Sequence, residues 1–258
     1  MKEEILSETK NNTRFSVLAI GDSGTGKTTA ALTATAYGTL IVLDFDGKLK
    51  ELKDKIPAET QKKIKVVSDF KTPSEVKKYL LVLKAEFEAG KSPCATICID
   101  TWSRLSEMLL RRMQASAGVP EGQDPSISDL VPLEQQKRLQ FTVWNLFTDV
   151  QESFISLLKS LPCNVIINAH VEKTQMEDGT IMLAVSGSGS FRKAMPQMFQ
   201  NTLFFSAQAG EYKIRARKSS NAIANNGLAD KWLTKEGLLI KPNYSVFEET
   251  AYRQPEVK

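Results

Sequence analysis

Residues 20–30 read Ile-Gly-Asp-Ser-Gly-Thr-Gly-Lys-Thr-Thr-Ala, and this stretch decides the fold. It contains the complete Walker A pattern, in which Gly21 and four intervening residues are followed by Gly26, Lys27 and Thr28. An apolar run over residues 15–21 precedes the motif, and a helix-forming stretch over 31–36 follows it. A phosphate-binding loop needs this context of a buried strand before it and a helix after it. The stretch therefore predicts a bound nucleoside triphosphate.

The residue types of this loop match the chemistry of a phosphate site. Glycines let the backbone wrap its N–H groups around a phosphate, and the start of a helix adds a favourable dipole. We expect Lys27 to reach the β- and γ-phosphates and Thr28 to hold Mg²⁺, with ATP as the nucleotide. The predicted nucleotide-binding residues are Gly21, Asp22, Ser23, Gly24, Thr25, Gly26, Lys27, Thr28 and Thr29.

Further along the chain, acidic residues come at the ends of apolar runs. Asp100 ends the run Ala-Thr-Ile-Cys-Ile-Asp, which is the Walker B arrangement and predicts a ligand of Mg²⁺; the alternative is a cap for the next helix. Asp44 and Asp46 lie at the end of the run over 39–45 and are candidates to orient or deprotonate the attacking water. The alternative for Asp46 is a turn cap before Gly47.

A histidine ends another apolar run. His170 is the single histidine of the chain and closes the run over 164–170. A strand end beside the phosphates favours a contact with the γ-phosphate, whereas a histidine satisfied by its own surroundings is the alternative.

The whole chain alternates between strand-like and helix-like segments. Continuous apolar runs are typical of a parallel sheet that is covered on both faces. The pattern predicts a single α/β domain: a mostly parallel sheet flanked by helices, extended by an antiparallel hairpin after residue 200. Expected strands cover 15–21, 39–45, 65–67, 95–100 and 164–170, and expected helices cover 72–90, 103–113 and 132–161. The expected division is a flexible 1–13, an ATPase domain over 14–240 and a tail over 241–258.

Composition places few limits on function. The chain has 258 residues, of which 41% are hydrophobic and 25% charged, and its net charge of +4 permits an acidic partner without requiring one. Its beginning is polar and acidic, unlike a signal peptide, and no apolar run has the roughly 18 residues of a membrane span. We therefore expect a cytoplasmic protein with no membrane partner.

Two basic segments follow His170. In the run Leu-Ala-Val-Ser-Gly-Ser-Gly-Ser-Phe-Arg-Lys-Ala-Met-Pro over 183–196, small residues precede Phe191, Arg192 and Lys193. Such a loop can contact single-stranded DNA, with cations on phosphates and a ring on a base; the alternative is a plain surface loop in which Phe191 packs inward. In the run over 211–220, Lys213, Arg215 and Arg217 alternate with other residues and are followed by Lys218, a pattern that is also typical of a protected edge strand.

With these motifs placed, the chain resembles the RecA-like core ATPases, and in particular the bacteriophage AAA-domain proteins proposed as RecA-like recombinases or single-strand annealing proteins. The resemblance implies that Asp46, rather than Asp44, activates water and that His170 senses the γ-phosphate. It also implies that the segment after His170 binds single-stranded DNA, and that Arg217 and Lys218 reach the nucleotide of a neighbouring subunit.

The function expected from this resemblance is DNA-stimulated ATP hydrolysis in phage recombination, annealing or replication. The implied partners are single-stranded DNA, a single-strand-binding protein and further copies of the chain. Catalytic roles are implied for Lys27, Asp46, Asp100 and His170. The alternatives that keep the same fold are a helicase loader, a packaging ATPase, a nucleotide switch and a small-molecule kinase.

Overall fold

The structure is a computed structural model that describes residues 14–116, 141–175, 181–186, 191–208, 211–217, 233–239 and 244. Its strands are β1 (Ser16–Gly21), β2 (Leu40–Asp44), β3 (Ile64–Val67), β4 (Thr96–Asp100), β5 (Asn164–Ala169), β6 (Val171–Gln175), β7 (Ile181–Val185), β8 (Asn201–Gln208) and β9 (Glu211–Arg215). Its α-helices are α1 (Lys27–Leu32), α2 (Ala58–Gln61), α3 (Pro73–Glu88), α4 (Trp102–Ser116), α5 (Phe141–Ser160) and α6 (Phe191–Ala194). The 3₁₀ helices are η1 (Thr33–Tyr37), η2 (Lys48–Lys55) and η5 (Met195–Met198).

The main sheet has seven strands in the order β3-β2-β4-β5-β1-β8-β9. Every neighbouring pair is parallel except β8 and β9, which form the antiparallel hairpin expected at the end of the sheet. The carboxyl ends of β2, β4, β5 and β1 therefore meet at one edge, where the ligands of such sheets bind. The predicted fold class is confirmed.

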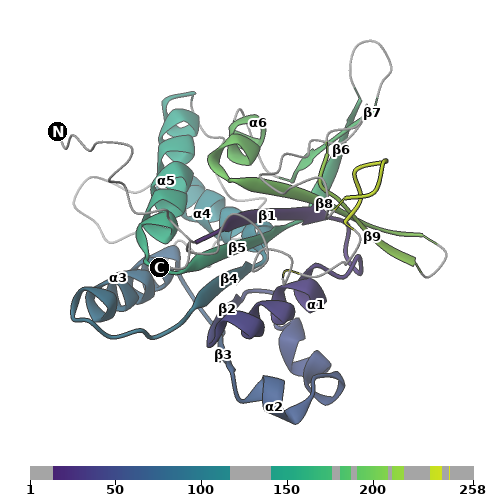
Figure 1. The fold of residues 1–258 in the computed structure, drawn as a ribbon. Coiled ribbons are helices and arrows are strands. Elements are labelled where there is room, and N and C mark those ends of the chain that lie inside the picture. Colours follow the sequence, from purple (N-terminus) through teal and green to yellow (C-terminus); the bar gives the residue numbers. More distant parts are fainter. Residues whose placement is uncertain are drawn as a thin grey trace, which may run out of the picture.

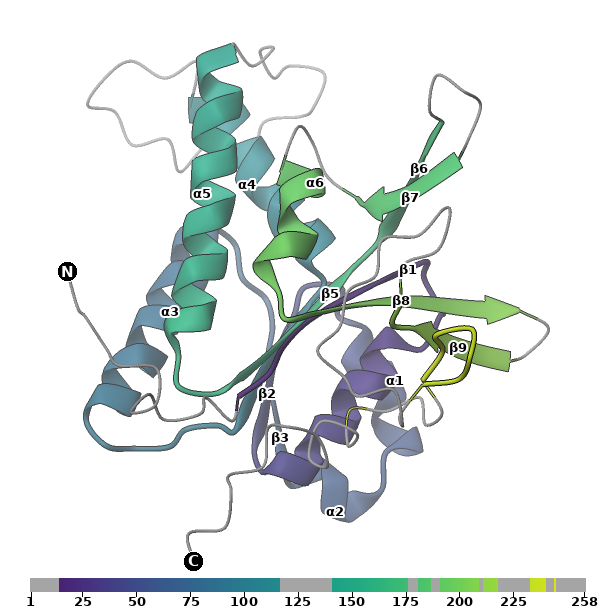
Figure 2. The ribbon, with the colours of Figure 1, turned by 45° about the horizontal axis from the view of Figure 1, so that its top comes forward.

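Helices cover both faces of this sheet, as Figures 1 and 2 show. Alternate strand residues point to opposite faces, so β1 contributes Leu18 and Ile20 to one core and Val17 and Ala19 to the other. The first core packs against α3, α4 and α5, and the second packs against α1. This two-sided burial explains why the strands read as continuous apolar runs.

The predicted helices are present with small shifts in their ends. Thr72 caps α3, and its hydroxyl accepts a hydrogen bond from the amide N–H of Glu75. Glu75 in turn accepts a 2.8 Å hydrogen bond from the amide of Lys71, one residue before the position that a capping box predicts. The last predicted helix is present as α5, and its expected first residues, 132–140, lie outside the described part of the chain.

Two features differ from the expectations. The segment after His170 begins as an antiparallel hairpin of β6 and β7, which projects from the main sheet in Figures 1 and 2. Tyr244, assigned to the tail, is buried in the core beside α1 and accepts a 2.9 Å hydrogen bond from the hydroxyl of Tyr37. Among the described residues, no helix combines the length and the apolar character that crossing a membrane requires.

Candidate active site

The phosphate-binding loop joins β1 to α1 at the carboxyl edge of the sheet. A Cβ atom on Gly21 would lie 2.5 Å from the carbonyl oxygen of Phe205 on β8, so only glycine fits there. The ammonium of Lys27 donates hydrogen bonds of 2.7 Å to the carbonyls of Gly21 and Asp22. Burial lowers the pKa of Lys27 to about 8, although the charges of Asp100 and Asp22 oppose this shift. A phosphate here would restore full charge to the lysine.

Asp100 lies beside this loop at the end of β4. Its carboxylate accepts a 2.7 Å hydrogen bond from the hydroxyl of Thr28 and a 3.1 Å hydrogen bond from Nδ2 of Asn168. Burial raises the pKa of Asp100, and these two hydrogen bonds act against that rise. The structure thus brings together the two residues predicted to hold Mg²⁺, one from α1 and one from β4.

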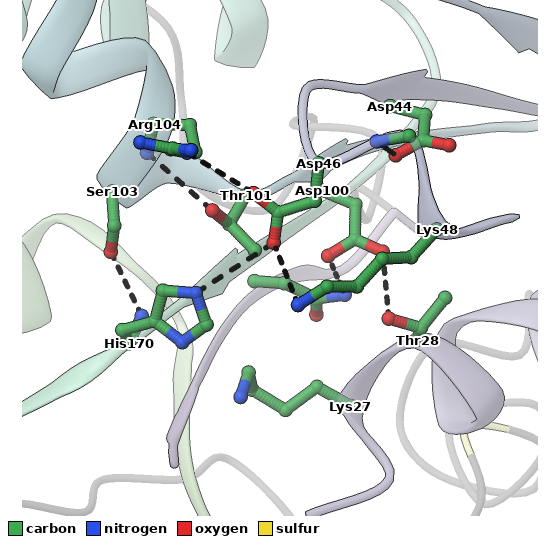
Figure 3. Close-up of polar contacts among 12 residues, drawn as sticks. Lys27, Thr28, Asp44, Asp46, Lys48, Asp100, Thr101, Ser103, Arg104 and His170 are labelled. Atoms are coloured by element: carbon green, nitrogen blue, oxygen red, sulfur yellow. Dashed lines mark hydrogen bonds and ion pairs between the residues drawn. The ribbon is translucent and has the colours of Figure 1, made fainter. Parts of the chain in front are cut away.

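Asp44 and Asp46, only two residues apart, have different surroundings. Asp44 is buried, and its carboxylate accepts hydrogen bonds from the backbone N–H groups of Gly47 and Leu49, at 2.8 and 3.0 Å. It therefore caps the turn into η2, the structural role that is the alternative for Asp46. Asp46 instead points into the site, as Figure 3 shows.

Three nitrogen-bearing side chains surround the carboxylate of Asp46 (Figure 3). Nζ of Lys48 and Nε of Arg104 each lie 3.6 Å from it, and Nε2 of His170 lies 3.7 Å away. The side chain of Asp46 is only 11% exposed, whereas those of Lys48 and Arg104 are more than half exposed. A carboxylate held in this way, lining the cleft, can accept a hydrogen bond from a water molecule there.

His170 follows β5 and is fixed by its backbone. Its amide N–H donates a 2.9 Å hydrogen bond to the hydroxyl of Ser103, and its carbonyl accepts a 2.7 Å hydrogen bond from the amide of Ser186. Burial lowers the pKa of His170, and the nearby charge of Lys27 lowers it further. A neutral imidazole in this position can donate to, or accept from, an oxygen in the site.

A cleft with a volume of about 710 Å³ opens beside these groups. Its lining includes Ser23, Asp46, Lys48, Arg104, His170 and Glu172. The cleft lies on the side of the loop that faces β4 and β5, where the terminal phosphate and the attacking water would meet.

The sequence carries a family signature over most of its length. Residues 13–228 match the family described as an AAA domain. The chain belongs to this AAA-domain family. It is a P-loop ATPase whose main sheet is mostly parallel. No curated protein matches the chain significantly.

One solved structure similar to this AAA-domain ATPase is an ATPase from the type III secretion system of pathogenic bacteria. The two share 12% sequence identity with a TM-score of 0.44, over 74% of this chain and 51% of that protein. The chain thus spans about half the length of that ATPase.

The donor set of the AAA-domain site fits a magnesium nucleotide. The Thr28 hydroxyl and the Asp100 carboxylate supply the hard oxygen ligands that Mg²⁺ prefers. Oδ1 of Asn168 is buried next to Asp100 and has no hydrogen-bond partner among the described residues, so it can accept a hydrogen bond from a water of the metal shell. When bound, the metal would neutralise charge on the phosphates, while Lys27 and the loop amides hold them in place.

The residues predicted to bind DNA do not share one environment. Phe191 is 3% exposed and packs on Trp102 of α4, with ring centroids 6.0 Å apart. This burial contradicts the base-stacking role expected for Phe191 and matches the inward packing considered as its alternative. Arg192 forms an ion pair of 3.5 Å with Glu172 of β6, and the side chain of Lys193 lies outside the described residues.

The residues predicted to act across a subunit interface lie beyond β9. Because β9 runs antiparallel to β8, its later residues lie progressively farther from the phosphate edge. Arg217 is exposed and lies beyond Arg215, which pairs with Phe204, so its backbone is farther from the phosphate edge than the residues of β9. Lys218 lies outside the described residues.

Sequence reasoning missed three members of the site. Asn168 is a polar residue inside a fully buried strand, which is itself a signal because buried amides need partners. Lys48 and Arg104 each follow a predicted site aspartate by a few residues. Nothing in their local pattern distinguishes them from ordinary surface cations, because only the sheet brings β2 and β4 side by side.

Proposed function

We propose that this ATPase acts on single-stranded DNA in bacteriophage recombination, annealing or replication, with Mg²⁺ bound by Thr28 and Asp100. The observation that carries the proposal is the 2.7 Å hydrogen bond from the amide of Ser186 to the carbonyl of His170. It joins the end of β7 to the end of β5. A change at the γ-phosphate side of the site can therefore reach the segment that β7 leads into, which includes Arg192 and Lys193.

A second contact, at the start of α6, supports this coupling. Trp102 lies two residues after Asp100 and is buried against Phe191, the first residue of α6. Packed cores transmit small displacements because they have few voids to absorb them. The chain leading to Arg192 and Lys193 is thus attached to His170 through Ser186, and to Trp102, near Asp100, through Phe191.

In this proposal the residues of the site divide the reaction between them. Lys27 and the loop amides bind the phosphates, and Asp46 orients or deprotonates water. His170 contacts the γ-phosphate and reports its presence to β6 and β7. Arg192 and Lys193 contact the DNA backbone, and Phe191 anchors their helix. The working form is a homo-oligomer in a bacterial cytoplasm, helped by a single-strand-binding protein.

The decisive experiment compares the rate of ATP hydrolysis with and without single-stranded DNA. We expect stimulation by single-stranded DNA that exceeds stimulation by an equal mass of duplex. Lys27→Ala is the matched control, because it removes the cation on the phosphates and should abolish turnover under both conditions. A wild-type rate of ATP hydrolysis that does not change when DNA is added would contradict the proposal. It would favour the helicase-loader, packaging or switch alternatives.

A further inference from the structure

Tyr212 is exposed on a strand face that is otherwise buried. The side chains of Ile214 on β9 and of Ala216 just after it are buried in the core that packs against α1. Tyr212 lies two residues earlier, so it belongs to the same face of the strand. It is nevertheless 59% exposed, and it is the one aromatic among the large exposed hydrophobic residues of the described chain.

The ring of Tyr212 lies against the phosphate-binding loop. A Cβ atom placed on Gly26 would be 3.3 Å from Cδ1 of Tyr212 and 3.8 Å from Cε1. Gly26 also has a φ of +86°, a conformation that other residues rarely adopt. The aromatic ring and the loop that should hold the phosphates are therefore in direct contact, while the larger part of the ring faces solvent.

The order of the strands indicates which way a nucleotide bound at the loop is oriented. Asp100 and His170 come from the ends of β4 and β5, on one side of β1, and the cleft opens there. The metal and the γ-phosphate belong on that side, because Mg²⁺ bridges the β- and γ-phosphates. The nucleoside end must then leave the loop toward the opposite side of β1. That side is formed by β8 and β9, which carries Tyr212.

We propose that Tyr212 is the base platform of the nucleotide site, on whose exposed ring face the nucleobase of the bound triphosphate stacks. Aromatic side chains bind bases by stacking without reading their edges, since every base has a π-face. Tyr212 therefore contributes affinity for the nucleoside and little selectivity between ATP and GTP. The inference rests on the phosphate site described above and extends it to the other end of the ligand.

The test uses the full chain, with Mg²⁺, and measures dissociation constants for ATP and for inorganic tripolyphosphate, which has no base. Tyr212→Ala should weaken ATP binding by about tenfold or more and leave tripolyphosphate binding within about twofold. Tyr212→Phe should bind both ligands like the wild type, because it retains the ring. Leu81→Ala, which removes an exposed apolar side chain from α3, is the matched control and should change neither constant.

A second measurement locates the contact directly. Transferred nuclear Overhauser effects should connect the H2 or H8 protons of adenine to ring protons of Tyr212 and disappear in Tyr212→Ala. Contacts from the ring to the ribose alone would overturn the stacking arrangement.

Three affinity results would also overturn the inference. Equal losses for ATP and tripolyphosphate in Tyr212→Ala would mean that the ring only supports the loop at Gly26. Unchanged ATP affinity in that variant would show that Tyr212 does not contact the base. Weaker ATP binding by Tyr212→Phe would show that the hydroxyl, and not the ring, makes the contact. Failure of the underlying phosphate site would look different: Lys27→Ala would then bind tripolyphosphate as well as the wild type.

Discussion

Thr28 donates a 2.7 Å hydrogen bond from its hydroxyl to Oδ2 of Asp100, and this bond joins the start of α1 to the end of β4. The two oxygens belong to the residues that we expect to hold Mg²⁺. Their approach means that the fold itself brings the expected metal ligands together, because β1 and β4 both flank β5 and all three strands end at the same edge.

Asp100→Asn should therefore remove the increase in ATP affinity that Mg²⁺ is expected to produce in the wild type. The amide is a weaker metal ligand than the carboxylate, so ATP hydrolysis should fall by roughly a hundredfold or more. In the wild type, ATP should bind more tightly with Mg²⁺ than with a chelator, and in the variant this difference should vanish. A variant that keeps the full Mg²⁺ effect would show that Asp100 is not a ligand of the metal.

The contrast between Asp44 and Asp46 can be tested with a pair of variants. Asp46→Asn should keep ATP affinity and slow hydrolysis by roughly 10²- to 10⁴-fold, because it changes a group that acts on water. Asp44→Ala should instead lower the free energy of unfolding by about 1–2 kcal/mol, because two backbone N–H groups lose their acceptor. Loss of ATP binding by folded Asp46→Asn would refute the water-activating role.

The titration of His170 can be followed by NMR without overlap from other imidazoles, because the chain has one histidine. Burial and the charge of Lys27 lower its pKa below the ordinary 6.5 in the empty protein. Since the unfolded chain then binds more protons between the two pKa values, stability should fall as the pH drops below about 6.5. An NMR titration of the imidazole measures the pKa, and His170→Gln should lose this part of the pH dependence of unfolding.

The same titration reports on the site when nucleotide is added. Negative phosphate charge beside the imidazole favours its protonated form, so the pKa of His170 should rise on binding ATP. Lys27→Ala, which should bind ATP weakly, is the control and should show little further rise. A pKa that ATP leaves unchanged would place His170 away from the γ-phosphate.

The sequence predicts the sheet well, because buried parallel strands read as apolar runs and their ends carry the site residues. Asp100 and Thr28 follow from motifs alone. The surroundings of Asp46 do not, because Arg104 reaches it only through the pairing of β2 with β4. The β6–β7 hairpin is missed for another reason. The Gly-Ser run that follows it dominates the pattern and suggests a loop throughout the segment.

Arg192 and Lys193 are expected to contact the backbone of single-stranded DNA. Each phosphate contact adds about 0.7 to the slope of binding against the logarithm of salt concentration, so Arg192→Ala with Lys193→Ala should flatten that slope by roughly 1.4. The basal ATPase should change little. Glu172→Gln is an informative partner variant: it removes the carboxylate paired with Arg192 and should strengthen DNA binding. An unchanged slope in the double variant would place the DNA site elsewhere.

Arg217 and Lys218 provide the test of assembly. The backbone of Arg217 lies beyond β9, away from the phosphate edge, so the proposed role in hydrolysis places it at the nucleotide of a second copy. A cation from that copy would stabilise charge that develops on the γ-phosphate. Arg217→Ala with Lys218→Ala should then abolish hydrolysis and preserve ATP binding. Mixing this variant with Lys27→Ala should restore part of the activity, because some interfaces would combine an intact loop with intact cations. The cross-subunit role fails if co-assembled mixtures stay inactive, or if the double variant hydrolyses ATP normally as a monomer.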